Sequence, residues 1–328
     1  MSTVKMFEYS DDIIKHIILF CDITTVSIIR MVSKKLRSQF NENRLIISKV
    51  CIINLFDWAI AIGCSTDDIM SNLGKSGCIE SFKLALKLGY NYDIKYCHFA
   101  ASNGHLNCLQ YLHEHNYPWD EDTCYLAASN GHLDCLRYAH ENGCPWDKHI
   151  CHAAAGNGYL ECLQYAHENG CSWDEETCNY AAENGHLDCL QYAYENECNW
   201  DEGTCNLAAE NGHLDCLRYA HENGCPWDAD TCRDAAGNGY LECLQYAYEN
   251  GCPWDADTCY HAAANGHLDC LRYAHENGCP WDEETCSHAA QNGHLDCLRY
   301  AHENGCPWSE NRRYYDDLIH FQYDNNCE

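Results

Sequence analysis

The sequence predicts an all-α solenoid, in which short helical hairpins stack in chain order behind a small helical N-terminal region. The dipeptide Asn-Gly recurs eight times at intervals of 27 residues, from Asn103 to Asn292. Trp recurs with the same interval from Trp119 to Trp308. A unit of 27 residues cannot bury its own apolar face, whereas stacked units share a continuous core.

Each unit contains start and stop signals for two helices. In the unit that begins at Asp120, this residue is placed to cap the first helix, and Gly131 can end that helix in the left-handed conformation. The second helix is expected over about residues 132–142; Gly143 ends it and Pro145 prevents its continuation. No remaining stretch is long enough for a useful β-strand.

Helical spacing divides the second helix into a buried and an exposed side. Leu133, Leu136 and His140 fall on one side, with Cys135 and Ala139 beside them. Asp134, Arg137 and Glu141 fall on the other side. This pattern is typical of a helix that packs on a core and shows its charges to water.

Charge is distributed unevenly along the 328 residues, whose formal net charge is −30. Residues 1–92 hold 11 Lys or Arg and 9 Asp or Glu, whereas residues 93–328 hold 9 and 41. So acidic a surface repels phosphate, and we therefore expect neither nucleic acid nor a membrane as a partner. A basic target protein would complement it.

The N-terminus shows no recognisable secretory signal, and the apolar stretch 13–20 is interrupted by Lys15 and His16. We therefore expect a cytoplasmic protein. In that reducing compartment the 28 Cys are predicted to be free thiols.

The segment DTCYLAASNGHLDCLRYAHENGC, residues 122–144, resembles an ankyrin repeat. The similarity lies in Ala127-Ala128, Gly131-His132 and Asn142-Gly143-Cys144, with Cys124 in place of a buried Leu. It extends over about residues 76–310 and implies a solenoid that serves protein–protein interaction without catalysis. Short units rich in Cys and Trp also resemble those of ankyrin proteins encoded by giant DNA viruses of amoebae, whose location would be the host cytoplasm.

The units differ from the ankyrin family in length. A family unit has about 33 residues, and the residues missing here fall between Trp119 and Thr123 and at the same place in each later unit. The family makes a β-hairpin finger there. The resemblance therefore implies that the fingers are absent or reduced to tight turns.

Residues 1–45 resemble an F-box, although Tyr9-Ser10 stand in place of its Leu-Pro opening and Leu36 in place of its usual Trp. The matching residues are Asp11, Asp12, Ile13, Ile14, Ile17, Ile18, Asp22, Val26, Val32, Ser33, Lys34 and Lys35. The resemblance implies a link to a cullin-type ubiquitin ligase through the F-box-binding adaptor, with apolar contacts from Ile13, Ile14, Ile17 and Val32. The alternative is a helical cap on the solenoid. Residues 46–75 are expected to be a degenerate helical repeat or linker, and residues 311–328 a C-terminal cap.

The recurring Cys and His residues are not predicted to form metal or catalytic sites. Cys124, Cys135, Cys144 and Cys151 are 11, 9 and 7 residues apart, without the close pairs of zinc sites. Packing as small apolar side chains is favoured. Eight copies of each candidate nucleophile indicate scaffolding, so we expect no cofactor and no enzymatic activity. A Cys-rich metal-binding protein stays open as an alternative.

Positions that differ between the repeats indicate where a partner is recognised. The two residues after the first-helix Cys and the residue before Asn-Gly vary most, and they lie about one helical turn apart. In ankyrin proteins this face lines the concave groove. The alternatives are drift at tolerant surface positions, or a plain binding or decoy module without a ubiquitin link. The candidates are His98, Phe99, Tyr125, Leu126, Ser129, His152, Asn179, Tyr180, Glu183, Asn206, Leu207, Glu210, Arg233, Asp234, Tyr260, His261, Ser287, His288 and Gln291.

Overall fold

The fold was obtained as a computed structural model, which describes residues 77, 79, 83 and 93–307. Residues 93–307 form α-helices α6 to α21 and no β-strand. This confirms the predicted all-α repeat fold, and short turns stand in this range where the ankyrin family has its hairpin fingers. The chain divides into two compact units, Met1–Trp146 and Asp147–Glu328. The F-box-like segment and the C-terminal cap lie outside the described residues.

The helices alternate between a first and a second helix of each repeat. Unit one contains α6 (Lys95–Ser102), α7 (Leu106–Glu114), α8 (Glu121–Ser129) and α9 (Leu133–Glu141). Unit two contains α10 (His149–Gly156), α11 (Leu160–Glu168), α12 (Glu175–Glu183), α13 (Leu187–Glu195), α14 (Glu202–Glu210), α15 (Leu214–Glu222), α16 (Ala229–Gly237), α17 (Leu241–Glu249), α18 (Ala256–Ala264), α19 (Leu268–Glu276), α20 (Glu283–Gln291) and α21 (Leu295–Glu303).

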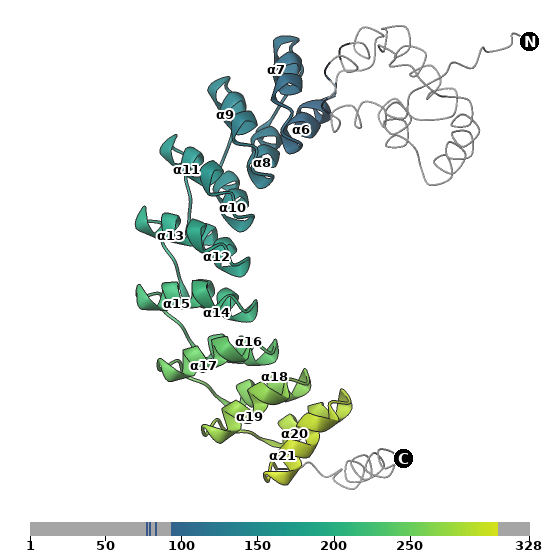
Figure 1. Cartoon of the computed structure of the whole chain (residues 1–328), viewed down its shortest axis with the longest axis vertical. Helices are drawn as coiled ribbons and strands as arrows, with labels where there is room; N and C mark the ends of the chain where they lie inside the picture. The colour runs from purple at the N-terminus through teal and green to yellow at the C-terminus, as the bar shows by residue number, and fades with distance from the viewer. Residues whose placement is uncertain (1–76, 78, 80–82, 84–92, 308–328) are drawn as a thin grey trace, which may run out of the picture. The chain divides into compact units, whose positions relative to one another are not determined.

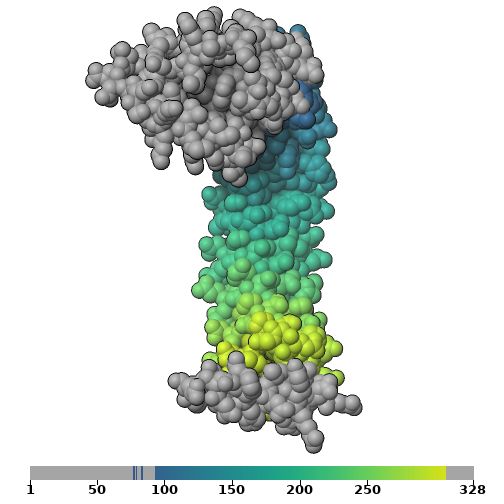
Figure 2. Space-filling view, turned by 90° about the vertical axis from the view of Figure 1, so that its right-hand side faces the viewer, coloured from purple at the N-terminus to yellow at the C-terminus, as the bar shows by residue number. Residues whose placement is uncertain are grey.

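The helices of unit two form two layers. The first helices, α10 to α20, pack on one another in chain order, and the second helices, α11 to α21, form the neighbouring layer (Figure 1). Figure 2 looks at unit two from the side of its first helices, whose colours pass from teal through green to yellow in chain order. Neighbours in sequence are therefore neighbours in space.

The core of each repeat is built from small side chains. In α12 and α13, Ala181, Ala182, Cys189, Leu190 and Ala193 are at most 1% exposed. Alanine and cysteine keep the helices close together, because neither side chain extends far from the backbone. All cysteines in the described residues are buried and free, which confirms their predicted packing role within this part of the chain.

The turn between the two helices is fixed by contact with the next repeat. Gly185, directly after α12, has φ +74°, and a Cβ at this position would lie 2.5 Å from Nδ1 of His213. Glycine is therefore required both by the left-handed backbone and by the neighbouring ring. His132 stands at the equivalent turn in unit one, and its Nε2 lies 3.2 Å from the carbonyl oxygen of Ser102. His132 thus serves as a hydrogen-bonding residue at the inter-helix turn.

The Trp residues fill the contact between the second helices of neighbouring repeats, which we call the seam. The ring of His167 stacks on Trp173 with centroids 3.7 Å apart, and Tyr192 of the next repeat meets both rings edge-on. Nδ1 of His167 also lies 3.1 Å from the Tyr192 hydroxyl. Tyr194 replaces the histidine in the next repeat and stacks on Trp200 with the same centroid separation, 3.7 Å. Each seam thus holds three aromatic rings.

In the described range, no helix has the length and apolar character needed to cross a membrane.

The contact between turn and ring predicts unequal effects of two matched glycine substitutions. Gly185→Ala and Gly224→Ala both place a side chain at positive φ, +74° and +84°, but only Gly185 has atoms within 4 Å of the new Cβ. We expect Gly224→Ala to lower stability by about 1 kcal/mol and Gly185→Ala by about 1–3 kcal/mol more, because His213 must move. Urea denaturation followed by circular dichroism checks this; equal shifts would rule out the contact as a constraint.

Candidate partner-binding surface

The variable residues all lie on first helices, and we call the surface they form the first-helix face. They are His98 and Phe99 on α6, Tyr125, Leu126 and Ser129 on α8, His152 on α10, Asn179, Tyr180 and Glu183 on α12, Asn206, Leu207 and Glu210 on α14, Arg233 and Asp234 on α16, Tyr260 and His261 on α18, and Ser287, His288 and Gln291 on α20. Their exposure differs widely. Tyr125 and Tyr180 are each 40% exposed, whereas His152 and Asn179 retain only 7% and 6%.

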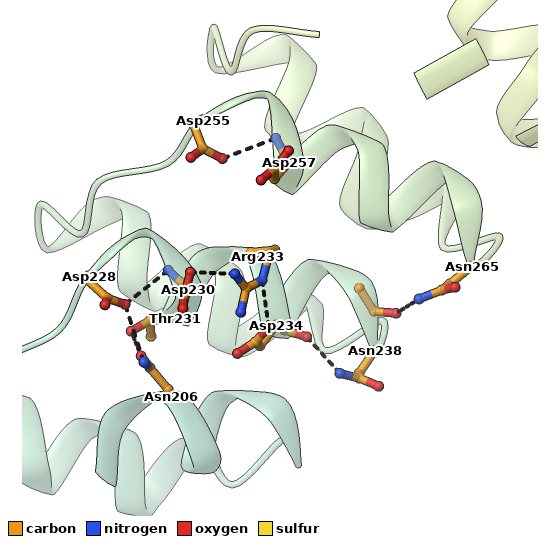
Figure 3. Close-up of polar contacts among 11 residues, drawn as sticks. Asn206, Asp228, Asp230, Thr231, Arg233, Asp234, Asn238, Asp255, Asp257 and Asn265 are labelled. Carbon is orange, nitrogen blue, oxygen red and sulfur yellow. Dashed lines mark hydrogen bonds and ion pairs between the residues drawn. The ribbon is translucent and has the colours of Figure 1, made fainter. Parts of the chain in front are cut away.

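Two asparagines of the first-helix face bind the next repeat. Thr204 Oγ1 donates a hydrogen bond of 2.6 Å to Asn179 Oδ1. One repeat later, Thr231 Oγ1 donates to Asn206 Oδ1, and Asn206 Nδ2 donates to Asp228 Oδ1 over 3.2 Å (Figure 3). These side chains therefore couple neighbouring repeats.

Some repeats have another residue type at the position of Asn179 and Asn206. The threonine of the following repeat then has no asparagine oxygen to bind. The hydroxyl groups of Thr177, Thr258 and Thr285 are buried and have no hydrogen-bond partner among the described residues. They follow His152, Arg233 and Tyr260 by 25 residues.

The aspartate before each first helix has two alternative roles. Asp201 and Asp228 cap their own helices, since their carboxylates accept hydrogen bonds from Gly203 N and Asp230 N. Asp120 occupies the predicted N-cap position of α8 but makes no side-chain cap bond. Its Oδ1 lies 2.6 Å from His98 Nε2 instead. The residue on the preceding first helix therefore decides which role the aspartate takes.

Asp174 shows the second role in unit two. Its carboxylate lies 2.6 Å from His152 Nε2 and 2.5 Å from Lys148 Nζ, and it does not cap α12. Burial acts to raise the pKa of Asp174, but the hydrogen bonds from Lys148 and His152 outweigh it and hold the pKa below its ordinary value. Lys148 is thereby engaged at the start of α10.

Arg233 is likewise neutralised within its own helix. Its Nη1 lies 2.5 Å from Asp230 Oδ1, and its Nε donates to Asp234 Oδ1 over 2.9 Å (Figure 3). Burial acts to lower the pKa of Arg233, but the two aspartates outweigh it and raise the pKa. The α16 part of the face thus carries an arginine without offering a free positive charge.

One group of side chains in unit one has the composition of a metal site. Donor atoms of His98, Asp120 and Asp122 lie within 4.8 Å of one another, and no other such group occurs in the described residues. However, the 2.6 Å between His98 Nε2 and Asp120 Oδ1 is a hydrogen-bond distance. Two of the three donors are therefore already engaged with each other.

Loop cysteines bind backbone carbonyl groups, and cysteines of the second helices are held in the protonated state. Cys198 Sγ donates to the carbonyl oxygen of Asp174 over 3.1 Å, and the equivalent loop cysteines repeat this bond with a carbonyl 24 residues earlier. Burial is the main cause that raises the pKa of Cys189 and Cys216 to about 12. A nucleophile requires the thiolate, so these residues have the wrong protonation state for catalysis.

The coupling between repeats was missed in the reasoning from sequence. An Asn after the first-helix Cys is followed by Thr 25 residues later, but Thr is also present after other residue types. Because nearly every repeat contains the same Asp and Thr, the sequence shows no matching change that would reveal the pairing. The three-dimensional stacking of α12 on α14 supplies the missing information.

Stacked helical hairpins with a constant core and a variable first-helix face define a repeat-type interaction scaffold. A family model described as ankyrin repeats (3 copies) matches residues 97–175 and 124–231. Residues 97–231 are therefore similar to ankyrin repeats, which form protein–protein interaction modules.

Two further comparisons concern individual proteins. No curated protein matches the chain. Among solved structures, the crystal structure of the human ASB11 ankyrin repeat domain is similar with a TM-score of 0.43 and 19% sequence identity, over 48% of this chain and 84% of that chain.

The asparagine contacts predict opposite effects of one substitution in two repeats. Thr204→Val removes the donor to Asn179, so a buried amide oxygen loses its partner, and we expect a loss of about 1 kcal/mol. Thr285→Val removes a hydroxyl that has no partner, and we expect an unchanged or slightly increased stability. Chemical denaturation of both variants tests this. Equal losses would show that Asn179 contributes nothing to the coupling.

The buried thiols predict a loss of stability in alkaline solution. A thiol of the unfolded chain ionises near pH 8.5, whereas the pKa of Cys189 and Cys216 in the folded protein is about 12. Their stabilising contribution is complete below about pH 8.5 and is lost as the pH rises towards the folded pKa, because only the unfolded state releases these protons. The urea concentration at which half of the protein is unfolded should therefore be lower at about pH 10 than at about pH 7.5. In Cys189→Ala/Cys216→Ala the fall should be smaller; an equal fall contradicts the assignment.

Proposed function

We propose that the protein is a non-enzymatic recognition adaptor that holds a target protein on its first-helix face. In this proposal, residues 1–45 link the target to a cullin-type ubiquitin ligase through the F-box-binding adaptor. The site of action would be the cytoplasm, that of the host cell if the protein is viral.

One observation carries the target-binding part of the proposal. The core and seam residues are nearly identical from repeat to repeat, whereas the first-helix face changes from Tyr180 and Glu183 on α12 to His288 and Gln291 on α20. Packing explains why the core and seam residues are constant, but it does not require the residues of the first-helix face to change. Exposed side chains that differ along a rigid stack are suited to recognising an extended protein surface.

The ligase part of the proposal rests on sequence similarity. Ile13, Ile14, Ile17 and Val32, the expected apolar contacts, lie outside the described residues. A chain without this link would act as a plain binding or decoy module, which the following experiment distinguishes.

The full chain is expected to capture the purified F-box-binding adaptor in a pull-down. Ile13→Asp/Ile17→Asp should reduce capture at least about tenfold, because two apolar contacts become charged. Ile47→Asp, outside the F-box-like segment, serves as the control and should capture the adaptor normally. No capture by the unmodified chain would refute the ligase link and leave the plain binding module.

The target-binding part needs a separate readout. Proteins cross-linked to the full chain in cells are compared by quantitative mass spectrometry with those cross-linked to a Tyr180→Ala/Leu207→Ala variant. Both side chains belong to the first-helix face, and their loss should deplete the target selectively. An identical set of proteins would place target binding elsewhere.

A further inference from the structure

We propose that the first-helix face binds its partner through a positively charged peptide segment that docks on α12 and α14. The docking surface consists of Tyr180 and the five carboxylates of Glu175, Glu176, Glu183, Glu202 and Glu210, and we call it the α12–α14 patch. This inference rests on the proposed function and specifies the chemistry of its target. Helices α12 and α14 pack on each other, so the patch is continuous across two repeats.

The spacing of the patch residues brings them to one side of the stack. Glu176, Tyr180 and Glu183 are four and three residues apart on α12, which places them on one face. Glu202 and Glu210 occupy on α14 the positions that Glu175 and Glu183 occupy on α12. In Figure 2 the first-helix side of α12 and α14 lies in the teal to green part of the stack, which is open to the viewer.

No ion pair within the described part of the chain joins a glutamate of the patch to a cation. The pKa of Lys148 is raised mainly by its hydrogen bond to Asp174 and additionally by the charges of Glu175 and Glu176, so in the described range only these two glutamates have a cation nearby. Ion pairs on the first helices of unit two join Lys148 to Asp174, His152 to Asp174, and Arg233 to Asp230 and Asp234. None involves a glutamate of the patch. The cations at either end, on α10 and α16, are thus occupied by other acids, and the field of the patch stays negative.

Tyr180 adds an aromatic contact that is held in place before any partner binds. Its ring lies 5.8 Å from that of His152, and its Cβ would be 3.1 Å from a Cβ on Gly156. The side chain is nevertheless 40% exposed. A tyrosine face surrounded by carboxylates attracts an arginine or lysine side chain both by charge and by cation–π contact.

The loop between α13 and α14 adds a further negative charge, which the equivalent loops at Gly224 and Gly251 do not have. Glu197 adopts φ 68° where equivalent positions such as Gly224 and Gly251 hold glycine. This conformation is unfavourable for glutamate, so the added carboxylate is present in spite of a local backbone cost. Cys198, the next residue, binds the Asp174 carbonyl at the start of α12, which brings the loop close to the patch.

These features select among possible occupants. An acidic peptide or a phosphorylated segment would be repelled by the carboxylates. A purely apolar segment would remove water from the carboxylates without offering them a partner. A basic segment of extended or helical form satisfies both the charge and the aromatic ring. Its arginines would interact with carboxylates on two successive repeats.

A labelled twelve-residue peptide of alternating Arg and Ser tests the proposal with the full chain. Fluorescence anisotropy should show binding that weakens from about 50 mM to about 150 mM NaCl as screening increases. Glu183→Gln/Glu210→Gln should raise Kd about three- to tenfold, and Tyr180→Ala about two- to fivefold. A peptide with Glu in place of Arg should not bind.

Matched controls separate the patch from the overall negative charge. Asp188→Asn/Asp215→Asn removes the same charge from exposed positions of the second helices α13 and α15, and Tyr240→Ala removes an equally exposed ring at the start of the second helix α17. Both should change Kd less than about twofold. Equal weakening by patch and control variants would overturn the proposal, as would saturable displacement of the peptide by Ca²⁺, which would indicate a cation site.

Failure of the patch and failure of the proposed function give different results. If cross-linking shows a target that depends on the first-helix face, while the patch variants retain that target fully, then only the α12–α14 inference is wrong. Circular dichroism of each variant confirms that its helices are intact before binding is measured.

Discussion

The close approach of neighbouring repeats is the constraint on which the rest of this structure depends. Helices of eight or nine residues are too short to persist alone in water, so each helix is stable only against its neighbours. Ala181, Ala182 and Cys189 leave room for this approach because their side chains are small. Positive-φ glycines at the inter-helix turns, such as Gly158, Gly185 and Gly239, then receive a ring from the following repeat. Shortening the unit to 27 residues is compatible with this contact, since the turn and not a hairpin makes it.

Packing between repeats also explains the many Cys and His residues of this chain. Cysteine serves as a small apolar side chain, and its thiol donates to a carbonyl oxygen in the loops. Histidine stacks on a Trp, as His167 does, lies on a glycine, as His213 does, or binds an aspartate, as His152 does. Residues that would indicate metal or redox chemistry in another fold are used here for stacking.

The first-helix face, which we propose as the recognition surface, also contributes to stability. Asn179 and His152 are variable between repeats, yet both bind the following repeat and are nearly buried. Tyr180, directly after Asn179, keeps a large exposed area. Neighbouring variable positions therefore differ in role. Asn179 couples one repeat to the next, whereas Tyr180 is exposed and available to a partner.

The sequence by itself determined the repeat length, the two helices of each repeat in the described range, the buried Leu, Cys and Ala positions, and the similarity to ankyrin repeats. These follow from periodicity and from the fixed conformational preferences of residues such as Gly131 and Asp120, which act locally. Only the tertiary structure decided which variable residues couple repeats, whether Asp174 caps its own helix or binds His152, and that Arg233 is neutralised by its own helix. The physical reason is that these choices depend on distances between side chains 22 to 25 residues apart, or on the rotamers of neighbours, and nearly identical repeats carry no sequence signal for either.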